Sequence, residues 1–341
     1  MSGGVDSSTS AALLQHQGFN VTGVFIKIWQ PEFIECTWRA DRLDAMRVCA
    51  ALGIPYLEID LSDEYKKEVV DIMVSDYTRG ITPNPDVLCN ERIKFGVFMR
   101  WALGQGANYV ATGHYAQIRE YNGKKVLARA IDAGKDQSYF LYRLSEADLA
   151  HVIFPIGEMH KSDVRILAGK FKLPIADKPD SQGLCFVGNV SMRDFLRRYI
   201  SVEGGDVIDK DGVRVGSHDG ASLYTIGQRH GFLVEKNTEG MPYFITTIDT
   251  HANTVTVSND KADTRCLDVC IKDMHWISPT SPQKSKRFLV QTRYHETPIL
   301  ATIEIGTEMV RVIFDTPHTA SPGQSLVVYD GDVCLGGGVI V

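Results

Sequence analysis

The stretch Ser2-Gly3-Gly4-Val5-Asp6-Ser7-Ser8 decides the fold class of this chain. Paired glycines let the backbone approach a ligand closely and adopt positive φ angles. The helix expected after them offers unpaired N–H groups and a positive dipole end to an anion. Ser7 and Ser8 add hydroxyl donors, and Asp6 is suited to hold a magnesium ion beside phosphates. The spacing is not that of a Walker A loop, so we predict a phosphate-binding loop of another class. The alternative is a simple Gly/Ser turn that caps a helix.

Strands and helices alternate after this loop through the first half of the chain. Apolar periodicity and Gly or Pro stop signals predict helices over 9–17, 39–52, 64–77 and 93–103, and strands over 21–29, 56–61 and 108–112. In the second helix we expect Leu43, Met46 and Ala50 to form the buried face. Such alternation is typical of a parallel α/β sheet.

The second half of the chain has a different pattern, in which turn signals separate short alternating runs from about Gly205 onward. Hairpin turns are expected at Asp211-Gly212, Asn253 and Asp330-Gly331. Strands are expected over 244–249, 254–258, 287–292, 299–305, 309–314 and 325–329. The predicted fold is an α/β nucleotide-binding domain with a parallel sheet, residues 1–200, followed by two small β-rich, barrel-like domains, residues 201–270 and 271–341.

Charge and composition restrict the class of protein only weakly. The chain of 341 residues has a net charge of −6, which argues mildly against a nucleic-acid partner. A local patch of positive charge matters more for nucleic-acid binding than the net charge of the chain. Two stretches of the sequence are basic, Arg193–Arg198 and Lys284–Arg293. Since the sequence contains neither an apolar run near the roughly 20 residues of a membrane span nor a signal-peptide pattern, we expect a cytoplasmic protein without a membrane partner.

Cysteines are few and thinly spread, at positions Cys36, Cys49, Cys89, Cys185, Cys266, Cys270 and Cys334. An odd count over a long chain does not suggest a disulfide framework. Zinc ribbons and iron–sulfur sites usually carry C-x-x-C pairs, which this sequence lacks. We therefore expect neither zinc nor an iron–sulfur cluster, and some thiols available for chemistry.

Two of these cysteines are candidates for catalysis. Cys89 follows a segment that two prolines stiffen, and the next helix carries Arg92 and Lys94. Cations one turn away from a cysteine at a helix start should lower its pKa and make it reactive. Cys185 lies in DSQGLCFVG, residues 180–188, with glycines on both sides. The other five cysteines are interpreted as small structural hydrophobes.

The loop at residues 2–8 resembles the PP-loop of the ATP pyrophosphatase superfamily, whose members cleave ATP between the α and β phosphates and adenylate an oxygen of their substrate. The strings TPNPDVLCN, KFG, ATGHY, KDQSYFLY, DSQGLCFVG, TIGQRHG and CLGGG follow in this order. Together they are similar to the tRNA-specific 2-thiouridylases of the MnmA/TrmU type, over nearly the whole chain. The resemblance implies an adenine nucleotide alpha-hydrolase-like N-terminal domain and a tRNA-uridine 2-sulfurtransferase that uses ATP and Mg²⁺.

The resemblance also implies roles for single residues. Cys89 matches the nucleophile and Cys185 the cysteine that carries a persulfide; a disulfide between the two would remain after sulfur release. The ATP site would comprise Ser2, Gly3, Gly4, Val5, Asp6, Ser7, Ser8, Ile26 and Gly113, where Ile26 replaces a family Met whose backbone faces adenine. The target base would meet Asn84, Pro85 and Asp86. Other tRNA contacts would be His114, Lys135, Asp136, Gln137, Arg293, Tyr294 and Gln324. A strand-end histidine satisfied by backbone is an equally good interpretation of His114.

Two alternatives stay open from the sequence. Another PP-loop ATP pyrophosphatase, either a ligase or a different tRNA-modifying enzyme, would explain residues 2–8 but not the two cysteine strings. An RNA-binding protein without catalysis should have lost Asp6, Cys89 or Cys185, and all three are present. The sulfur donor is either a cysteine desulfurase or a sulfur-relay protein, and the sequence does not distinguish them. It also leaves the tRNA set and the oligomeric state open.

The start of the chain raises a separate expectation. In α/β nucleotide sites a strand precedes the phosphate loop, and such a central strand is rich in Val and Ile. Only Met1 precedes Ser2. We therefore expect the natural protein to begin several, mostly apolar, residues earlier.

Overall fold

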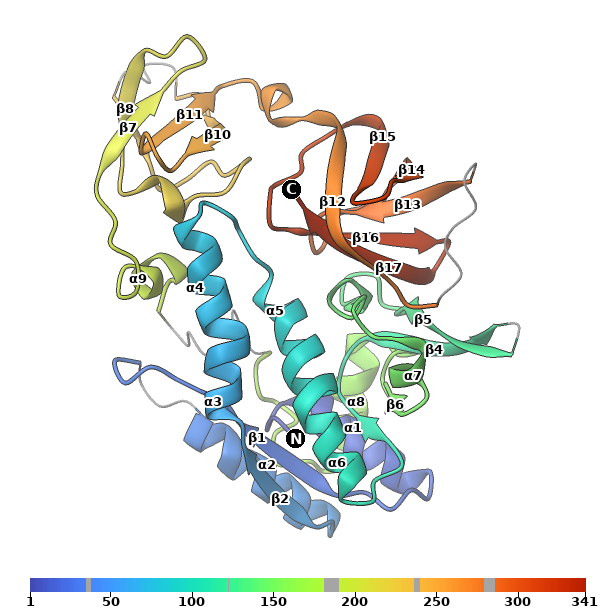
Figure 1. Ribbon diagram of the computed structural model, residues 1–341. Helices are drawn as coiled ribbons and strands as arrows, with labels where there is room; N and C mark the ends of the chain where they lie inside the picture. Colours follow the sequence, from blue (N-terminus) through green and yellow to red (C-terminus); the bar gives the residue numbers. More distant parts are fainter. Residues whose placement is uncertain (35–37, 122, 181–189, 236–239, 279–285) are drawn as a thin grey trace.

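The computed structural model describes residues 1–34, 38–121, 123–180, 190–235, 240–278 and 286–341. Figure 1 shows an α/β domain at the bottom, a small β-domain at the upper left and a barrel at the upper right. In the part of the chain so described, no helix is both long and apolar enough to cross a membrane.

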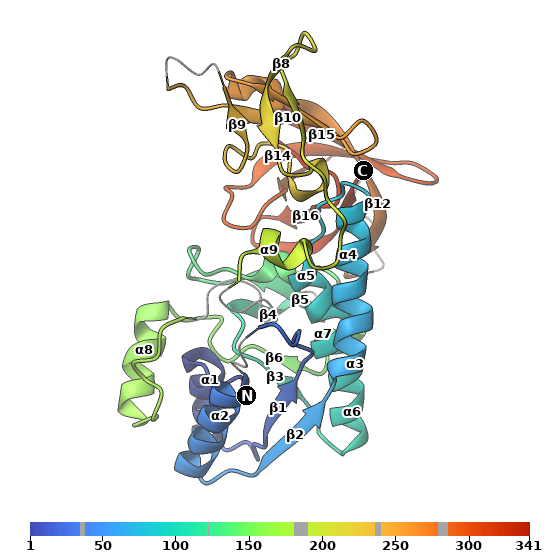
Figure 2. The ribbon, with the colours of Figure 1, turned by 90° about the vertical axis from the view of Figure 1, so that its left-hand side faces the viewer.

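Parallel strands form the centre of the N-terminal domain, as predicted. β1 (Gly23–Lys27) pairs with β2 (Tyr56–Asp60), and β3 (Val110–Ala111) pairs with β6 (Val152–Ile153). The described residues place these strands in two separate two-stranded sheets. Helices α1 (Val5–His16), α2 (Trp38–Leu52) and α8 (Lys161–Lys170) lie together beside the strands in Figure 2. The α-amino group of Met1 donates to the carbonyl of Val24 at 2.5 Å, which holds the start of the chain against β1.

Two long helical segments rise from this domain toward the β-domains (Figure 1). The first combines α3 (Ser62–Tyr65), the π-helical η1 (Lys66–Val70) and α4 (Asp71–Thr78). The second combines α5 (Pro85–Leu88), the π-helical η2 (Cys89–Phe98) and α6 (Met99–Gly104). The second begins eight residues before the position 93 that we predicted, because Asn84 caps it and Pro85 fits the first helical turn.

The expected buried face of α2 was wrong. Leu43 and Met46 are 48% and 38% exposed, and Ala50 is exposed too. Ala45, Val48 and Cys49 are buried instead. Both sets have helical spacing, so periodicity alone could not decide between them. The packing of α2 against α1 and β1 selects the smaller residues.

The C-terminal domain is a closed six-stranded barrel. Its strands are β12 (Cys266–Trp276), β13 (Arg287–Gln291), β14 (Ile299–Ile305), β15 (Val310–His318), β16 (Ser325–Asp330) and β17 (Val333–Ile340). The order is β12-β15-β14-β13-β16-β17, and pairing of β12 with β17 closes it. The predicted strands of this region are confirmed, whereas β12 and β17 were missed. β12 begins at Cys266, so it crosses the boundary that we expected between residues 270 and 271.

A hairpin of the N-terminal domain extends the barrel sheet. β4 (Ala116–Tyr121) and β5 (Lys124–Arg129) were not predicted, and β5 pairs with β17. Arg129 donates to Gln291 Oε1 at 3.0 Å, and its guanidinium lies 4.4 Å from the centre of the Tyr329 ring. These contacts join the N-terminal domain and the barrel through a shared sheet and a buried polar interface.

The central β-domain is a five-stranded sheet in the order β10-β11-β7-β8-β9. Its strands are β7 (Gly205–Ile208), β8 (Arg214–His218), β9 (Leu233–Val234), β10 (Phe244–Asp249) and β11 (Thr254–Ser258). The turn at Asn253 is confirmed by a positive φ of 51°. The remaining short helices are η3 (Ser138–Phe140), α7 (Glu146–Leu149), α9 (Met192–Leu196), η4 (Ala221–Leu223) and η5 (Lys261–Thr264).

Candidate active site

The predicted phosphate loop ends directly at the N-terminus of α1. Gly3 has a φ of 71°, and a Cβ at this position would lie 2.3 Å from the carbonyl oxygen of Asp41. Glycine is therefore required by both conformation and space. Gly4 is the N-cap, so the cap residue itself has no side chain to bond the first N–H groups of the helix. The Ser8 hydroxyl donates to the Gly4 carbonyl at 2.8 Å, and the Ser2 and Ser7 hydroxyls lie 3.0 Å apart.

Gly113 and Ile26 are the other predicted ATP residues, and the structure places only Gly113 against this loop. A Cβ on Gly113 would lie 2.6 Å from the backbone nitrogen of Ser7, so the 112–114 segment can approach α1 only because position 113 is glycine. Ile26 lies on β1, opposite Ile59 of β2, and packs partly buried against the core. The structure thus brings residues 2–8 and Gly113 into contact.

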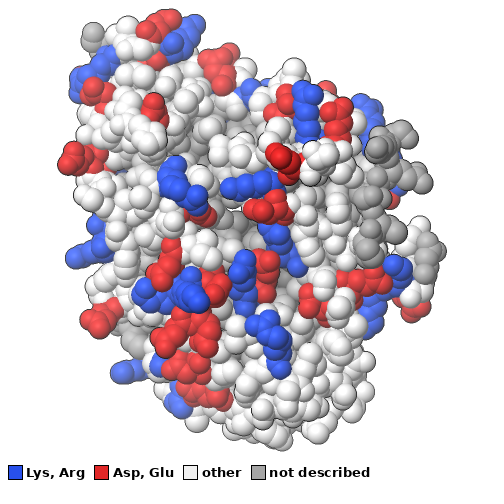
Figure 3. All heavy atoms as spheres, in the orientation of Figure 1, with Lys and Arg blue, Asp and Glu red and all other residues white. Residues whose placement is uncertain are grey.

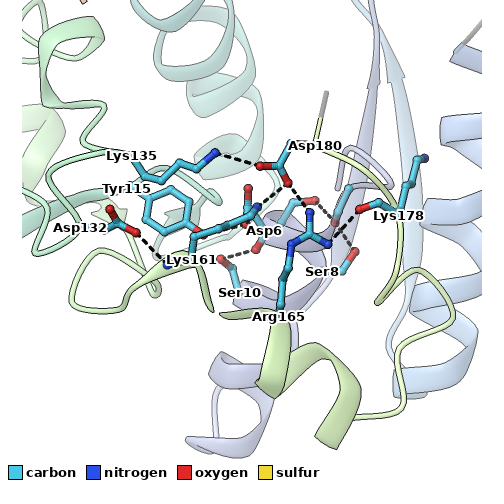
Figure 4. A network of polar contacts seen from close by, with 12 residues as sticks. Asp6, Ser8, Ser10, Tyr115, Asp132, Lys135, Lys161, Arg165, Lys178 and Asp180 are labelled. Carbon is cyan, nitrogen blue, oxygen red and sulfur yellow. Dashed lines mark hydrogen bonds and ion pairs between the residues drawn. The ribbon is translucent and has the colours of Figure 1, made fainter. Parts of the chain in front are cut away.

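Asp6 is the first member of a charged network that the sequence did not reveal (Figure 4). Its Oδ1 accepts hydrogen bonds from the Tyr115 hydroxyl at 2.9 Å and from Lys161 Nζ at 2.6 Å. Lys161 belongs to the first turn of α8 and is only 13% exposed. Its ammonium also lies 2.9 Å from Asp180 Oδ1, so it bridges two carboxylates.

Asp180 gathers three cations around one carboxylate. Besides Lys161, Lys135 Nζ lies 2.9 Å from Oδ2 and Arg165 Nη2 lies 2.7 Å from Oδ1. Burial alone would raise the pKa of Asp180, but hydrogen bonds from Lys161 and Lys135 outweigh it and lower that pKa to about 2. Asp180 therefore keeps its negative charge and holds the three cations near the phosphate loop.

Lys178 contacts the phosphate loop at Gly3. Its ammonium donates to the Gly3 carbonyl at 3.1 Å, to Asp41 at 2.8 Å and to Asp44 at 2.7 Å. Burial opposes its charge, yet the hydrogen bonds to the two carboxylates raise the pKa of Lys178. The backbone of Gly3 is thus fixed to the start of α2.

A magnesium ion fits this donor set in a limited way. Among the residues that the structure describes, no group of three or more His, Cys, Asp or Glu side chains is arranged to hold a metal. Magnesium commonly takes one or two carboxylates and completes its shell with water and substrate phosphates. Both contacts given above for Asp6 fall on Oδ1. Its Oδ2 could therefore contribute one such ligand.

Cys89 lies one helical turn after Pro85, where α5 continues into η2, and is partly buried. The two cations expected beside it have other partners. Arg92 donates to Glu68 at 3.2 Å, and Lys94 donates to Asn90 at 3.0 Å. The second catalytic candidate, Cys185, lies outside the described residues, as does Cys36.

The predicted base-binding residues Asn84, Pro85 and Asp86 lie where the three domains meet. The Asn84 side chain accepts from Val87 N at 3.4 Å and caps α5. The Asp86 side chain is exposed on the surface, but the protein around it removes part of its hydration and raises its pKa. The positive charge of the nearby Lys94 offsets only part of this rise. Burial, together with the negative charges of Asp136 and Asp86, raises the pKa of Tyr294 to about 12. Tyr294 of the barrel packs against Phe140, with the two ring centres 4.5 Å apart.

Several predicted tRNA contacts are engaged inside the protein. His114 is 8% exposed, its Nδ1 lies 2.7 Å from the Thr112 hydroxyl, and burial and Lys94 lower its pKa. Asp136 accepts hydrogen bonds from Ala130 N and from Ser138.

The other predicted contacts follow the same pattern. Lys135 holds Asp180, as described above. Gln137 exchanges two hydrogen bonds with the backbone of Tyr115. Arg293 and Gln324 tie domains together, as shown below. Contact of these residues with RNA stays a prediction.

Some of the basic residues in the two basic stretches are paired with acids. Lys286 pairs with Asp330, and Arg287 pairs with Asp315 at 2.7 Å. Arg193 and Arg197 both pair with Asp219. Figure 3 shows Lys and Arg side chains, with Asp and Glu side chains among them, around the hollow in the middle of one face, where the three domains meet. Lys284 lies outside the described residues.

Sequence reasoning missed Tyr115, Lys161, Arg165, Lys178 and Asp180. Tyr115 and Asp180 lie in the strings ATGHY and DSQGLCFVG, but nothing there assigned either of them a role. The neighbours of Lys161, Arg165 and Lys178 in the sequence give no recognisable spacing. Of these five residues, Asp180 could most readily have been identified as a site residue from the sequence, because it is the first residue of the string that contains Cys185.

Fold and site define a class of protein: an α/β nucleotide-binding protein with a PP-loop-type helix N-terminus and two appended β-domains. Three protein families match consecutive parts of the chain. They are described as the tRNA methyl transferase HUP domain over residues 1–189, the tRNA methyl transferase PRC-barrel domain over 193–259, and the aminomethyltransferase beta-barrel domain over 267–340.

Similar proteins include the tRNA-specific 2-thiouridylases MnmA of Shigella flexneri, of Shigella boydii serotype 18 and of Escherichia coli K12. Each is 42% identical over 349 aligned residues, which cover 100% of this chain and 95% of the relative. The chain belongs to the MnmA family of tRNA-specific 2-thiouridylases, a family of tRNA-modifying enzymes.

Proposed function

We propose that this protein converts the 2-carbonyl of the wobble uridine of tRNA into a 2-thiocarbonyl, at the expense of ATP. The observation that carries the proposal is the 42% identity, over the full length, to proteins named tRNA-specific 2-thiouridylase. The charged network at the N-terminus of α1 and the position of Cys89 next to Asn84–Asp86 support it. Two family descriptions name methyl transfer instead. We follow the relatives, because methyl transfer does not account for a loop that binds ATP phosphates.

ATP activates the carbonyl in the first step. The uridine 2-oxygen attacks the α-phosphorus, the bond to the β-phosphate oxygen breaks, and pyrophosphate leaves. The oxygen thereby becomes part of AMP, a leaving group, so one difficult substitution is divided into two easier ones. N–H groups at the N-terminus of α1 and the cations Lys161, Lys135 and Arg165 would neutralise the phosphates. Magnesium, when bound through Asp6, would supply further charge neutralisation at the same phosphates.

Sulfur enters in the second step. Cys185 carries a persulfide, which it receives from a cysteine desulfurase or a sulfur-relay protein. The Cys89 thiolate attacks the inner sulfur, a Cys89–Cys185 disulfide forms, and hydrosulfide is released. The two thiols are oxidised and the outer sulfur is reduced, so electrons balance. Hydrosulfide then attacks carbon 2 of the base and expels AMP, and a thiol reductant restores the two cysteines.

The tRNA must present its wobble base outside the anticodon stack, as base-modifying enzymes generally require. Asn84, Pro85 and Asp86 would meet the extruded base in the hollow between the domains. The β-domains would bind the surrounding stem and loop, since proteins read unpaired RNA bases and backbone shape.

Mass spectrometry of tRNA nucleosides tests the proposal. The protein is incubated with ATP, magnesium, a persulfide source and tRNA from cells that lack 2-thiouridine. We expect 2-thiouridine, and pyrophosphate release that depends on tRNA. Release of pyrophosphate with a small amino acid or nucleotide, but not with tRNA, would identify another PP-loop enzyme and reject the proposal.

A further inference from the structure

The segment before Asn84 is held by the barrel. Thr82 N donates to the carbonyl of Pro322 at 3.2 Å. In return, the side-chain amide of Gln324 donates to the carbonyls of Thr82 at 2.8 Å and Pro83 at 3.3 Å. Gly323 allows this close contact, because a Cβ there would lie 2.7 Å from the Thr82 carbonyl oxygen.

The central domain holds the same segment from a second side. The hydroxyls of Thr82 and Thr225 lie 2.8 Å apart. Arg293 then joins the two β-domains, because its Nη2 donates to the Ile226 carbonyl at 2.7 Å and to the Ser321 hydroxyl at 2.8 Å. A continuous set of hydrogen bonds therefore connects residues 225–226, Ser321, Gln324 and Thr82.

The chain continues from this anchored point straight into the proposed base site. Asn84 follows Thr82 by two residues and caps α5, and Cys89 comes five residues later in the same helical segment. The helix is stiff, whereas residues 79–84 form a connection without regular structure. The hydrogen bonds from both β-domains thus fix the entry to the helix that carries the nucleophile.

We propose that Gln324 is a positioning residue, which acts through the 82–86 segment and holds Asn84, Pro85 and Asp86 in place for the target base. The family resemblance had suggested a tRNA contact for this residue. The amide nitrogen of Gln324 has two N–H groups, and the two carbonyls of the loop use them both. This inference rests on the proposed function, because the positioned loop is the one that would meet the uridine.

The variant Gln324→Met tests this role, because it keeps the length of the side chain and removes both donors. Binding and chemistry are measured separately, as the dissociation constant of tRNA and the single-turnover thiolation rate at saturating tRNA. We expect the rate to fall about tenfold while the dissociation constant changes less than about twofold. Gln105→Met, an exposed position at the far end of α6, is the matched control. Thr225→Val removes the hydrogen bond that the central domain makes to Thr82. It should likewise lower the thiolation rate and leave the dissociation constant of tRNA nearly unchanged.

Amide hydrogen exchange on the free protein provides a second measurement that does not need activity. Gln324→Met should speed up exchange in residues 81–88 and leave α1 unchanged. A weaker tRNA affinity at an unchanged rate would make Gln324 a direct tRNA contact and overturn the proposal. So would unchanged exchange in residues 81–88. If the wild-type protein thiolates no tRNA, the proposed function fails, whereas the exchange measurement still decides the positioning role.

Discussion

Lys161 Nζ donates to the carboxylate of Asp6 across 2.6 Å, which joins the first turn of α8 to the first turn of α1. The two residues are 155 positions apart in the sequence. An ammonium that is only 13% exposed beside a helix N-terminus is placed to exchange a carboxylate partner for a phosphate. The predictions below start from this pair.

Lys161→Met should weaken ATP binding by about 10- to 100-fold, the effect of losing a charge-assisted hydrogen bond of about 1.5–3 kcal/mol. Binding of AMP should change less than about twofold, because the lost contact is expected at the β and γ phosphates. Isothermal titration calorimetry with ATP, pyrophosphate and AMP measures this difference. Lys170→Met, at the exposed end of the same helix, serves as the control. Equal losses for AMP and ATP would point to a general structural defect instead.

Asp6→Asn should strongly slow pyrophosphate release while ATP still binds. Asparagine retains an oxygen for Tyr115 and Lys161 but loses the charge that a magnesium ligand needs. Since such a metal stabilises the transition state by several kcal/mol, the rate should fall about a hundredfold or more. A coupled pyrophosphate assay over a range of magnesium concentrations checks this expectation. Asp63→Asn, at an exposed position, should behave like wild type, and an unchanged rate for Asp6→Asn would remove Asp6 from the mechanism.

Cys89→Ser should release pyrophosphate with tRNA but neither expel AMP nor form 2-thiouridine, because activation precedes sulfur release. Cys185→Ser should in addition fail to accept radiolabelled sulfur from a persulfide donor. Cys270→Ser, on β12 of the barrel, is the control and should retain activity. Sulfur labelling of Cys185→Ser at the level of wild type would show that another residue carries the persulfide.

The oxidised wild-type protein should contain a Cys89–Cys185 disulfide after one turnover. Peptide mapping without reductant identifies the bridge. A bridge between Cys266 and Cys270 alone would contradict the proposed sulfur step.

The sequence predicts those parts of the molecule that depend on local patterns. Strands β1, β2 and β3 and most strands of the barrel follow from alternating or continuous apolar runs, whereas β6, the partner of β3, was not predicted. The loop at residues 2–8 could be recognised because all its residues are contiguous. Contacts between distant segments could not be predicted in this way.

The clearest example is Lys161, whose partners are at positions 6 and 180. Likewise, the β4–β5 hairpin joins the barrel through Ala128 and Leu127, which pair with residues of β17 about 200 positions later. Arg293 and Gln324 illustrate a related limit of prediction from the sequence. The family resemblance marked them as tRNA contacts, but only the structure shows that they bond to other domains of the same chain.

His114 should make folding stability depend on pH below about 6.5, the pKa of a histidine in an unfolded chain. Burial beside Phe95 and Phe154 and the nearby Lys94 ammonium lower its pKa in the folded protein. As pH falls below 6.5, the unfolded chain therefore binds a proton that the folded protein does not. Stability is lost in this window, by at most about 1.4 kcal/mol per pH unit for one such group.

Urea denaturation between pH 7.5 and 5 measures this dependence, and the variant His114→Asn isolates the contribution of one residue. We expect the variant to lose less stability on acidification than wild type, whatever its stability at pH 7.5. His218, whose pKa burial also lowers, should account for part of the dependence that remains. His251→Asn, at an exposed position, should leave the slope unchanged. If His114→Asn and wild type lose stability in parallel as the pH falls, the imidazole of His114 is protonated in the folded protein as readily as in the unfolded one, and its burial has no effect on its charge.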